Sequence, residues 1–271
     1  MSKTNFKDLL DSGVHFGHLT RKWNPRMAPY IFMEKNGIHV IDLNKTINKL
    51  DQACSALKHL AKSGRKVMFV ATKKQAKDSV STHAQRVNMP YITERWSGGL
   101  LTNFATIRKA IKKMNSIDKM KTDGTIDTLS KRERLQVSRT REKLEKNLGS
   151  IATMNRIPAA LFIVDIHREH IAVAEAKKLG IPTFAIVDTN SDPSLVDFCI
   201  PANDDASRSI EKIISIVTDS IQEGLSEREN EKQVSAKAKS EDTSLEKTEE
   251  KDVLIEDKNN EVETPSEESK Q

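Results

Sequence analysis

Short apolar runs that alternate with helical patterns constrain the fold of this chain more than any other feature. The runs are continuous and rich in β-branched and aromatic residues, as in strands covered on both faces. The segments between them carry apolar residues at three- and four-residue steps, which predicts helices. We therefore expect an α/β fold, with a mostly parallel sheet and helices on both of its faces. The apolar runs lie at 66–71, 159–164, 183–187 and 198–201, and a brief strand is expected at 89–92. The helices are expected at 45–62, 74–87 and 168–179, and from about 206 to 223. Asn44 is the expected cap of the first helix, and Asp204 or Asp205 that of the last.

The stretch from 104 to 154 interrupts this alternation. Its apolar residues follow a helical period on both sides of a turn-rich break at 121–125, and Ser130 with Glu133 forms a capping box that marks a new helix start. This pattern predicts two antiparallel helices, a coiled-coil-like hairpin inserted between two strands. Cations outnumber anions in the hairpin. A solvated surface would account for these cations, but we favour contact with phosphate. The candidate contacts in the hairpin are Arg108, Lys109, Lys112 and Lys113.

Residues 13–32 form a second distinctive segment. Gly and Pro are too dense there for a helix, and two histidines, several cations and four aromatic residues lie among them. Aromatic rings can stack on bases and cations can neutralise phosphates, so the segment is expected to grip RNA. A β-hairpin should follow, because Asn36-Gly37 joins two β-rich runs. The candidate RNA contacts here are His15, His18, Arg21, Lys22, Trp23, Asn24 and Arg26.

The distribution of charge supports a polyanionic partner. The chain has 44 Lys+Arg and 39 Asp+Glu. Residues 231–271 hold 7 Lys and 13 Asp+Glu, which leaves 37 cations and 26 anions, or +11, in residues 1–230. A body this basic points to nucleic acid. The segment 226–271 has almost no apolar residues, so we expect a disordered acidic tail.

The ends of the predicted strands are where an α/β enzyme would bind its ligand. The alternative to an RNA-binding protein is therefore a nucleotide-phosphate-binding enzyme on a Rossmann-like fold, but no glycine-rich phosphate loop occurs in the sequence. Asp165 and Asp188 at neighbouring strand ends could bind Mg²⁺ or act as a base, although capping of helices and turns explains them, and Asp192, more simply. His15 and His18 have no further metal ligand near them in sequence, so we expect no metal or other cofactor, with Mg²⁺ and Zn²⁺ left open. Helix starts and loops at these ends could still hold RNA phosphates, and the candidate contacts there are Lys73, Lys74, Arg95 and Trp96.

The remaining global features suggest a cytosolic protein. Cys54 and Cys199 are isolated thiols, which fits a reducing compartment. The N-terminal residues have no apolar signal core, and no window is apolar enough to span a membrane. The expected divisions are 1–43 for the N-terminal helix, RNA-gripping segment and hairpin, 44–103 and 157–225 for the two parts of the α/β domain, 104–156 for the basic helical hairpin, and 226–271 for the tail.

Three blocks of residues resemble one family. Gly13-Val-His-Phe-Gly-His18 with Trp23-Asn24-Pro25 resembles the N-terminal motif of the bacterial small-subunit ribosomal protein S-two family. Arg95-Trp-Ser-Gly-Gly99 with Leu101-Thr-Asn-Phe104 resembles its middle motif. The C-terminal motif is matched by residues from Asp165 to Ala206, and the resemblance runs from about residue 4 to 225.

This resemblance implies a flavodoxin-like α/β domain with a helical hairpin. It also implies a structural, non-enzymatic role in translation on the small subunit, through contacts with small-subunit rRNA. Neighbouring ribosomal proteins are implied as partners, among them the large mRNA-binding ribosomal protein S-one, which the family helps to dock. Phe198-Cys199 and the acidic tail depart from the family pattern, so no function is assigned to either.

Overall fold

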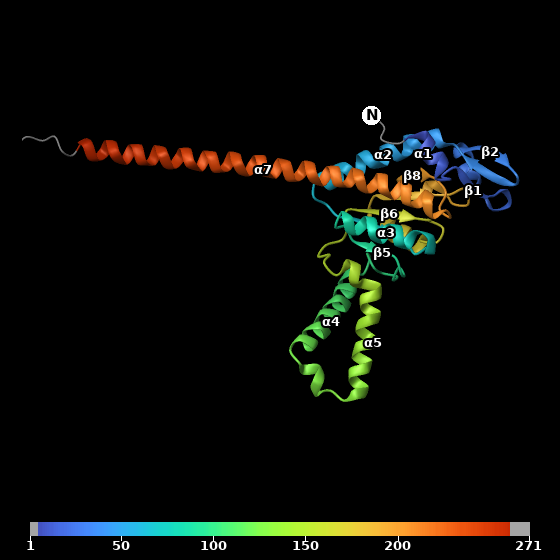
Figure 1. Cartoon of the computed structure of the whole chain (residues 1–271), viewed down its shortest axis with the longest axis horizontal. Coiled ribbons are helices and arrows are strands. Elements are labelled where there is room, and N and C mark those ends of the chain that lie inside the picture. Colours follow the sequence, from blue (N-terminus) through green and yellow to red (C-terminus); the bar gives the residue numbers. More distant parts are fainter. Residues whose placement is uncertain (1–4, 261–271) are drawn as a thin grey trace, which may run out of the picture. The chain divides into compact units, whose positions relative to one another are not determined.

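A parallel five-stranded sheet forms the centre of the computed structural model, which describes residues 5–260 and the side chains of residues 5–233 (Figure 1). The strands occur in the order β5-β4-β6-β7-β8, and every pairing is parallel. In chain order this is 2-1-3-4-5, the flavodoxin-like arrangement. The strands are β4 (Val67–Val70), β5 (Tyr91–Ile92), β6 (Ala160–Val164), β7 (Thr183–Val187) and β8 (Phe198–Pro201).

Helices cover both faces of this sheet, as the sequence predicts. Alternate residues of each strand point to opposite faces, so Phe69 and Phe162 belong to one core, whereas Met68 and Leu161 belong to the other. The first core is closed by α1 (Phe6–Asp11), α2 (Leu43–Lys62), α3 (Lys74–Arg86) and the beginning of α7 (Ser207–Asn260). The second is closed by α6 (His170–Leu179), the loop around Trp96, and parts of α4 (Phe104–Thr122) and α5 (Lys131–Leu148).

A small antiparallel sheet precedes the parallel one. It consists of β1 (Phe16–Leu19), β2 (Ile31–Lys35) and β3 (Ile38–Ile41), in the order β1-β3-β2. The predicted hairpin is confirmed, since Asn36 and Gly37 both adopt positive φ, at 55° and 73°, between β2 and β3. β1 was not predicted, because a strand of four residues within a Gly- and Pro-rich segment depends on its distant partner β3. Short 3-10 helices, η1 (Thr20–Lys22) and η2 (Pro25–Tyr30), occupy the rest of the irregular segment.

Two predicted helix caps are wrong. Asp42, rather than Asn44, caps α2, and its side chain accepts a hydrogen bond from the backbone N–H of Asn44. Asp204 and Asp205 do not cap α7. The Asn203 side chain instead accepts from the backbone N–H groups of Asp205 and Ala206, because both aspartates are held by other partners described below.

The helices α4 and α5 lie between β5 and β6 in the sequence and side by side in space (Figure 1). The Arg141 Nε donates to Asp118 Oδ1 at 2.8 Å and links the two helices. The capping box at Ser130 is present, with Glu133 returning a hydrogen bond to the Ser130 backbone N–H. The remaining short 3-10 helices are η3 (Thr125–Thr128), η4 (Gly149–Ile151) and η5 (Pro193–Leu195).

The chain divides into two units, residues 1–225 and 226–271. The sequence predicts disorder from 226, but the structure differs there, because α7 continues to Asn260. The segment is rich in Glu and Lys, which favour a helix. Residues 261–271 of the predicted tail lie outside the described residues.

Candidate nucleic-acid interface

The irregular N-terminal segment is fixed to the carboxyl end of the parallel sheet. The His18 backbone N–H donates to Thr189 Oγ1 at 2.8 Å, and the Asn24 backbone N–H donates to the Thr189 carbonyl at 2.8 Å. Gly17 permits this approach, since a Cβ there would lie 2.7 Å from Thr189 Cγ2 and 3.0 Å from the His39 carbonyl oxygen. The anchor after β7 therefore determines which way residues 19–26 face.

The His18 ring takes part in this anchor. Its Nδ1 lies 2.9 Å from Asp188 Oδ2 and its Nε2 lies 3.3 Å from Asp205 Oδ2. The Asp188 carboxylate raises the pKa of His18 above the ordinary value. Sequence analysis proposed His18 as an RNA contact, whereas the structure directs both ring nitrogens to carboxylates of the protein.

Lys73, another predicted RNA contact, also faces the protein interior. Its Nζ lies 2.7 Å from Asp204 Oδ1, 2.7 Å from Asp205 Oδ1 and 3.6 Å from Asp165 Oδ2. Burial lowers the pKa of Lys73, but these carboxylates outweigh burial and raise it. Lys73 follows β4 at the point where strand order reverses, so its ammonium group fills the crevice in which this topology binds phosphates. In this structure the Lys73 ammonium group is therefore engaged by carboxylates of the protein, and its contact with RNA stays a prediction.

The same carboxylates form a potential metal-binding group. His18, Asp188, Asp204 and Asp205 each offer one ligand atom, and these atoms lie within 4.8 Å of one another. Within the described part of the chain, Asp204 Oδ2 is buried and accepts no hydrogen bond, and burial with Asp188 and Asp165 raises the pKa of Asp204 to about 7. An imidazole with carboxylates suits a divalent cation such as Zn²⁺. No sequence motif predicts this set, because His18 is some 170 residues or more from its partners.

The loop containing Trp96 is folded inward around one carboxylate. Glu175 of α6 accepts hydrogen bonds from Trp96 Nε1 at 3.1 Å and from the backbone N–H groups of Gly99, Leu101 and Thr102 at 2.7, 3.0 and 3.1 Å. Burial raises the pKa of Glu175, but these donors outweigh burial, so the pKa is lowered. Trp96 is 6% exposed and lies in the second core. The Trp96 ring is therefore part of the core in this structure, and its contact with RNA stays a prediction.

Other predicted contacts lie at the surface. Trp23 is 38% exposed, and its ring lies 5.1 Å from that of His39. Asn24 caps η2 through its side chain, and His15, partly buried, lies against the Phe16 ring. Arg26 pairs with Asp192 and donates to Ser194 Oγ at 2.8 Å, while its side chain stays 65% exposed. The exposed cations among the candidates are Arg21, Lys22, Arg26, Lys74, Arg95, Arg108, Lys109, Lys112 and Lys113.

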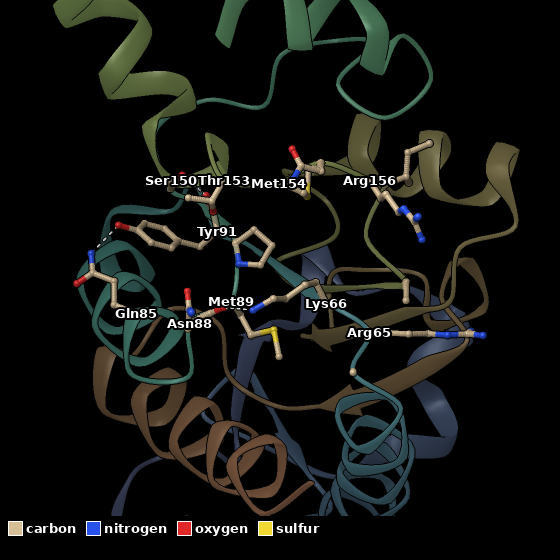
Figure 2. Close-up of a pocket in the computed structure, with 15 residues that line it drawn as sticks. Arg65, Lys66, Gln85, Asn88, Met89, Tyr91, Ser150, Thr153, Met154 and Arg156 are labelled. Atoms are coloured by element: carbon tan, nitrogen blue, oxygen red, sulfur yellow. Dashed lines mark hydrogen bonds between the residues drawn. The ribbon is translucent and has the colours of Figure 1, made fainter. Parts of the chain in front are cut away.

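A pocket of about 780 Å³ lies at the opposite, amino-terminal end of the parallel sheet. It is formed by residues that precede β4, β5 and β6 and by the segment after α5 (Figure 2). Free nucleotides bind this topology at the carboxyl ends of the strands. The position of this pocket therefore does not support a nucleotide-binding enzyme. The crevice at the carboxyl ends of the strands, where such an enzyme would bind its nucleotide, is occupied by Lys73.

Among the described residues, no helix is long and apolar enough to cross a bilayer.

Comparison with known proteins identifies the family. Curated relatives named small ribosomal subunit protein uS2 are 68% identical in Flavobacterium johnsoniae, over 87% of this chain and 92% of the relative, and 66% identical in Phocaeicola vulgatus, over 86% and 83%. The ribosomal protein S2 family profile matches residues 9–224. The chain therefore belongs to the ribosomal protein S2 family, whose members are structural components of the bacterial small ribosomal subunit and not enzymes.

Proposed function

We propose that this protein, on cytoplasmic ribosomes, binds small-subunit rRNA through two basic surfaces. The N-terminal surface consists of Arg21, Lys22 and Arg26 beside Trp23. The helical surface consists of Arg108, Lys109, Lys112 and Lys113 on α4. The observation that carries this proposal is that all these side chains are exposed. Arg26 also pairs with Asp192, whereas Asp118 on α4 pairs with Arg141 of α5 and not with the cations of α4 named here. Folded RNA offers phosphates in such patterns, and exposed cations bind them without reading duplex sequence.

We propose further that α4 and α5 act together as one antiparallel arm. The Arg141–Asp118 ion pair joins the two helices and removes the sole carboxylate that the sequence of α4 contains. Ile111, Met114 and Ile117 are buried along the same helix. The cations of α4 are thus exposed to solvent. In this proposal the basic unit 104–156 binds rRNA, and the α/β domain holds it in place.

Salt-dependent binding to an rRNA fragment tests both surfaces. Replacing Arg108, Lys109, Lys112 and Lys113 by Gln should weaken binding and flatten the slope of log K against log salt by about 0.7–0.9 for each lost phosphate contact. Replacing Arg21, Lys22 and Arg26 should act in the same direction. Lys177 and Lys178 on α6 are exposed cations outside both surfaces and serve as the control. A slope that stays at the wild-type value in a variant would remove that surface from the interface.

We propose that the small antiparallel sheet docks the large mRNA-binding ribosomal protein S-one. Phe16, Leu19, Phe32 and Met33 are exposed on β1 and β2, with Phe32 70% exposed. Grouped apolar side chains at a surface are typical of protein contacts. The double variant Phe32→Ser and Met33→Ser should reduce co-purification of that partner with the subunit. Leu179→Ser, on exposed apolar surface elsewhere, is the control, and equal loss in both would contradict this docking surface.

A further inference from the structure

The pocket at the amino-terminal end of the sheet has a lining that favours an anion. Arg65, Lys66 and Arg156 contribute cations, and none of the described residues that line the pocket is Asp or Glu. Arg65 and Arg156 make no side-chain hydrogen bond or ion pair within the described part of the chain, and both are exposed. Lys66 Nζ donates to the Asn88 carbonyl at 2.6 Å, which holds its charge at the pocket wall. Unpaired cations in a concave site attract a phosphate or carboxylate.

The other side of the pocket is suited to a planar group. Figure 2 shows Tyr91 and Gln85 on the side away from Arg65 and Arg156. Gln85 Nε2 donates to the Tyr91 hydroxyl at 2.6 Å, and Ser150 Oγ donates to the Tyr91 carbonyl, so the position of the ring is fixed from both ends. A fixed aromatic ring can stack on a base, and the Asn88 and Gln85 amides offer hydrogen bonds to its edge.

We propose that this pocket receives one unpaired nucleotide of rRNA, with its phosphate at Arg65 and Arg156 and its base at Tyr91. The inference rests on the proposed rRNA binding and adds a specific subsite to it. The volume of about 780 Å³ falls within the range of small-ligand sites. The lack of carboxylates disfavours a cation, and the position at the amino ends of the strands disfavours a free nucleotide. A nucleotide that is part of a longer RNA, which the two proposed basic surfaces bind elsewhere along its length, satisfies both conditions.

The test uses the full chain and a labelled single-stranded hexaribonucleotide. The double variant Arg65→Gln with Arg156→Gln, and separately Tyr91→Leu, should each reduce its affinity about tenfold, the scale of one charged contact or one stacked base. Lys177→Gln with Lys178→Gln should leave the affinity unchanged. Far-UV circular dichroism establishes that each variant is folded, and ultraviolet crosslinking followed by mass spectrometry should place the crosslink on the Tyr91 peptide.

Each other outcome overturns the proposal in a distinguishable way. Unchanged hexaribonucleotide affinity in the pocket variants, with rRNA binding still sensitive to the α4 variants, would reject the pocket while preserving the proposed function. Unchanged rRNA binding in every variant would reject both the pocket and the proposed function. Displacement of the oligonucleotide by a polyglutamate peptide, with the same sensitivity to Arg65 and Arg156, would assign the pocket to an acidic protein segment. Tight binding of AMP alone would assign it to a free nucleotide.

Discussion

The loop around Trp96 and the segment around Trp23 look alike in sequence and face opposite ways in the structure. Both combine tryptophan, arginine and glycine, and both seemed suited to gripping RNA. The first is drawn inward because Glu175 accepts hydrogen bonds from the Trp96 ring and from three backbone N–H groups. The second is anchored through its backbone, His18 and the Arg26 side chain, and Trp23 and its neighbouring cations stay at the surface. One buried carboxylate therefore accounts for the inward position of the Trp96 loop, whereas the Trp23 segment stays at the surface.

The largest effect that tests this contrast should come from Glu175→Gln. An amide retains one acceptor but places an NH₂ group among donors, so we expect a loss of about 3 kcal/mol in the free energy of unfolding. Urea denaturation followed by circular dichroism measures it. Glu142→Gln on the exposed face of α5 should change stability by less than about 0.5 kcal/mol. Similar values for the two variants would show that the carboxylate does not hold the loop.

The same carboxylate predicts a dependence of stability on pH. Because the pKa of Glu175 is lower in the folded state than in the unfolded state, its contribution is fully present above the unfolded value, about 4.3, and is lost as pH falls through the folded value. Thermal unfolding between pH 6 and pH 3 should show a smaller decline for Glu175→Gln than for the wild type. Parallel curves would contradict this assignment.

Glycine substitutions probe the anchors of the two regions. Gly17→Ala places a Cβ against Thr189 and the His39 carbonyl and should cost about 2 kcal/mol, because the backbone must move. Gly98→Ala, in the Trp96 loop, meets no atom within 4 Å and should cost well under 1 kcal/mol. Denaturant midpoints compare them directly. A larger loss of stability for Gly98→Ala than for Gly17→Ala would contradict the close approach of the backbone at Gly17.

The smallest effect on stability should come from Trp23. Trp23→Ala should change the free energy of unfolding by less than about 1 kcal/mol, since the ring is only partly covered, but should weaken rRNA binding. Trp96→Phe should do the reverse, with a stability loss and little direct effect on RNA affinity in the folded fraction. Filter binding alongside thermal melts separates the two, and a large stability loss in the Trp23 variant would place it in the core.

Sequence patterns predicted what depends on neighbours along the chain. The Asn36-Gly37 turn and the Ser130–Glu133 capping box each act within a few residues, and both are present. The continuous apolar runs predicted the buried parallel strands for the same reason. The partners of Trp96 and His18 could not be predicted from local patterns because they are far away in the sequence. Glu175 lies 79 residues from Trp96, and Asp188 reaches His18 only once the parallel sheet has formed. Asp42 caps α2 instead of Asn44 because the cap is fixed by where the chain leaves β3.

Lys73 affects how the stability of this fold depends on its surroundings. Flavodoxin-like proteins that bind a free anion in their crevice gain a stability that rises with the logarithm of the ligand concentration once the site is mostly filled. Here the positive group and its carboxylate partners belong to the same chain, so their effective concentration is constant. The positive group in the crevice, next to which the N-terminal segment is attached, is therefore present as soon as the chain has folded, whatever the concentration of free anions.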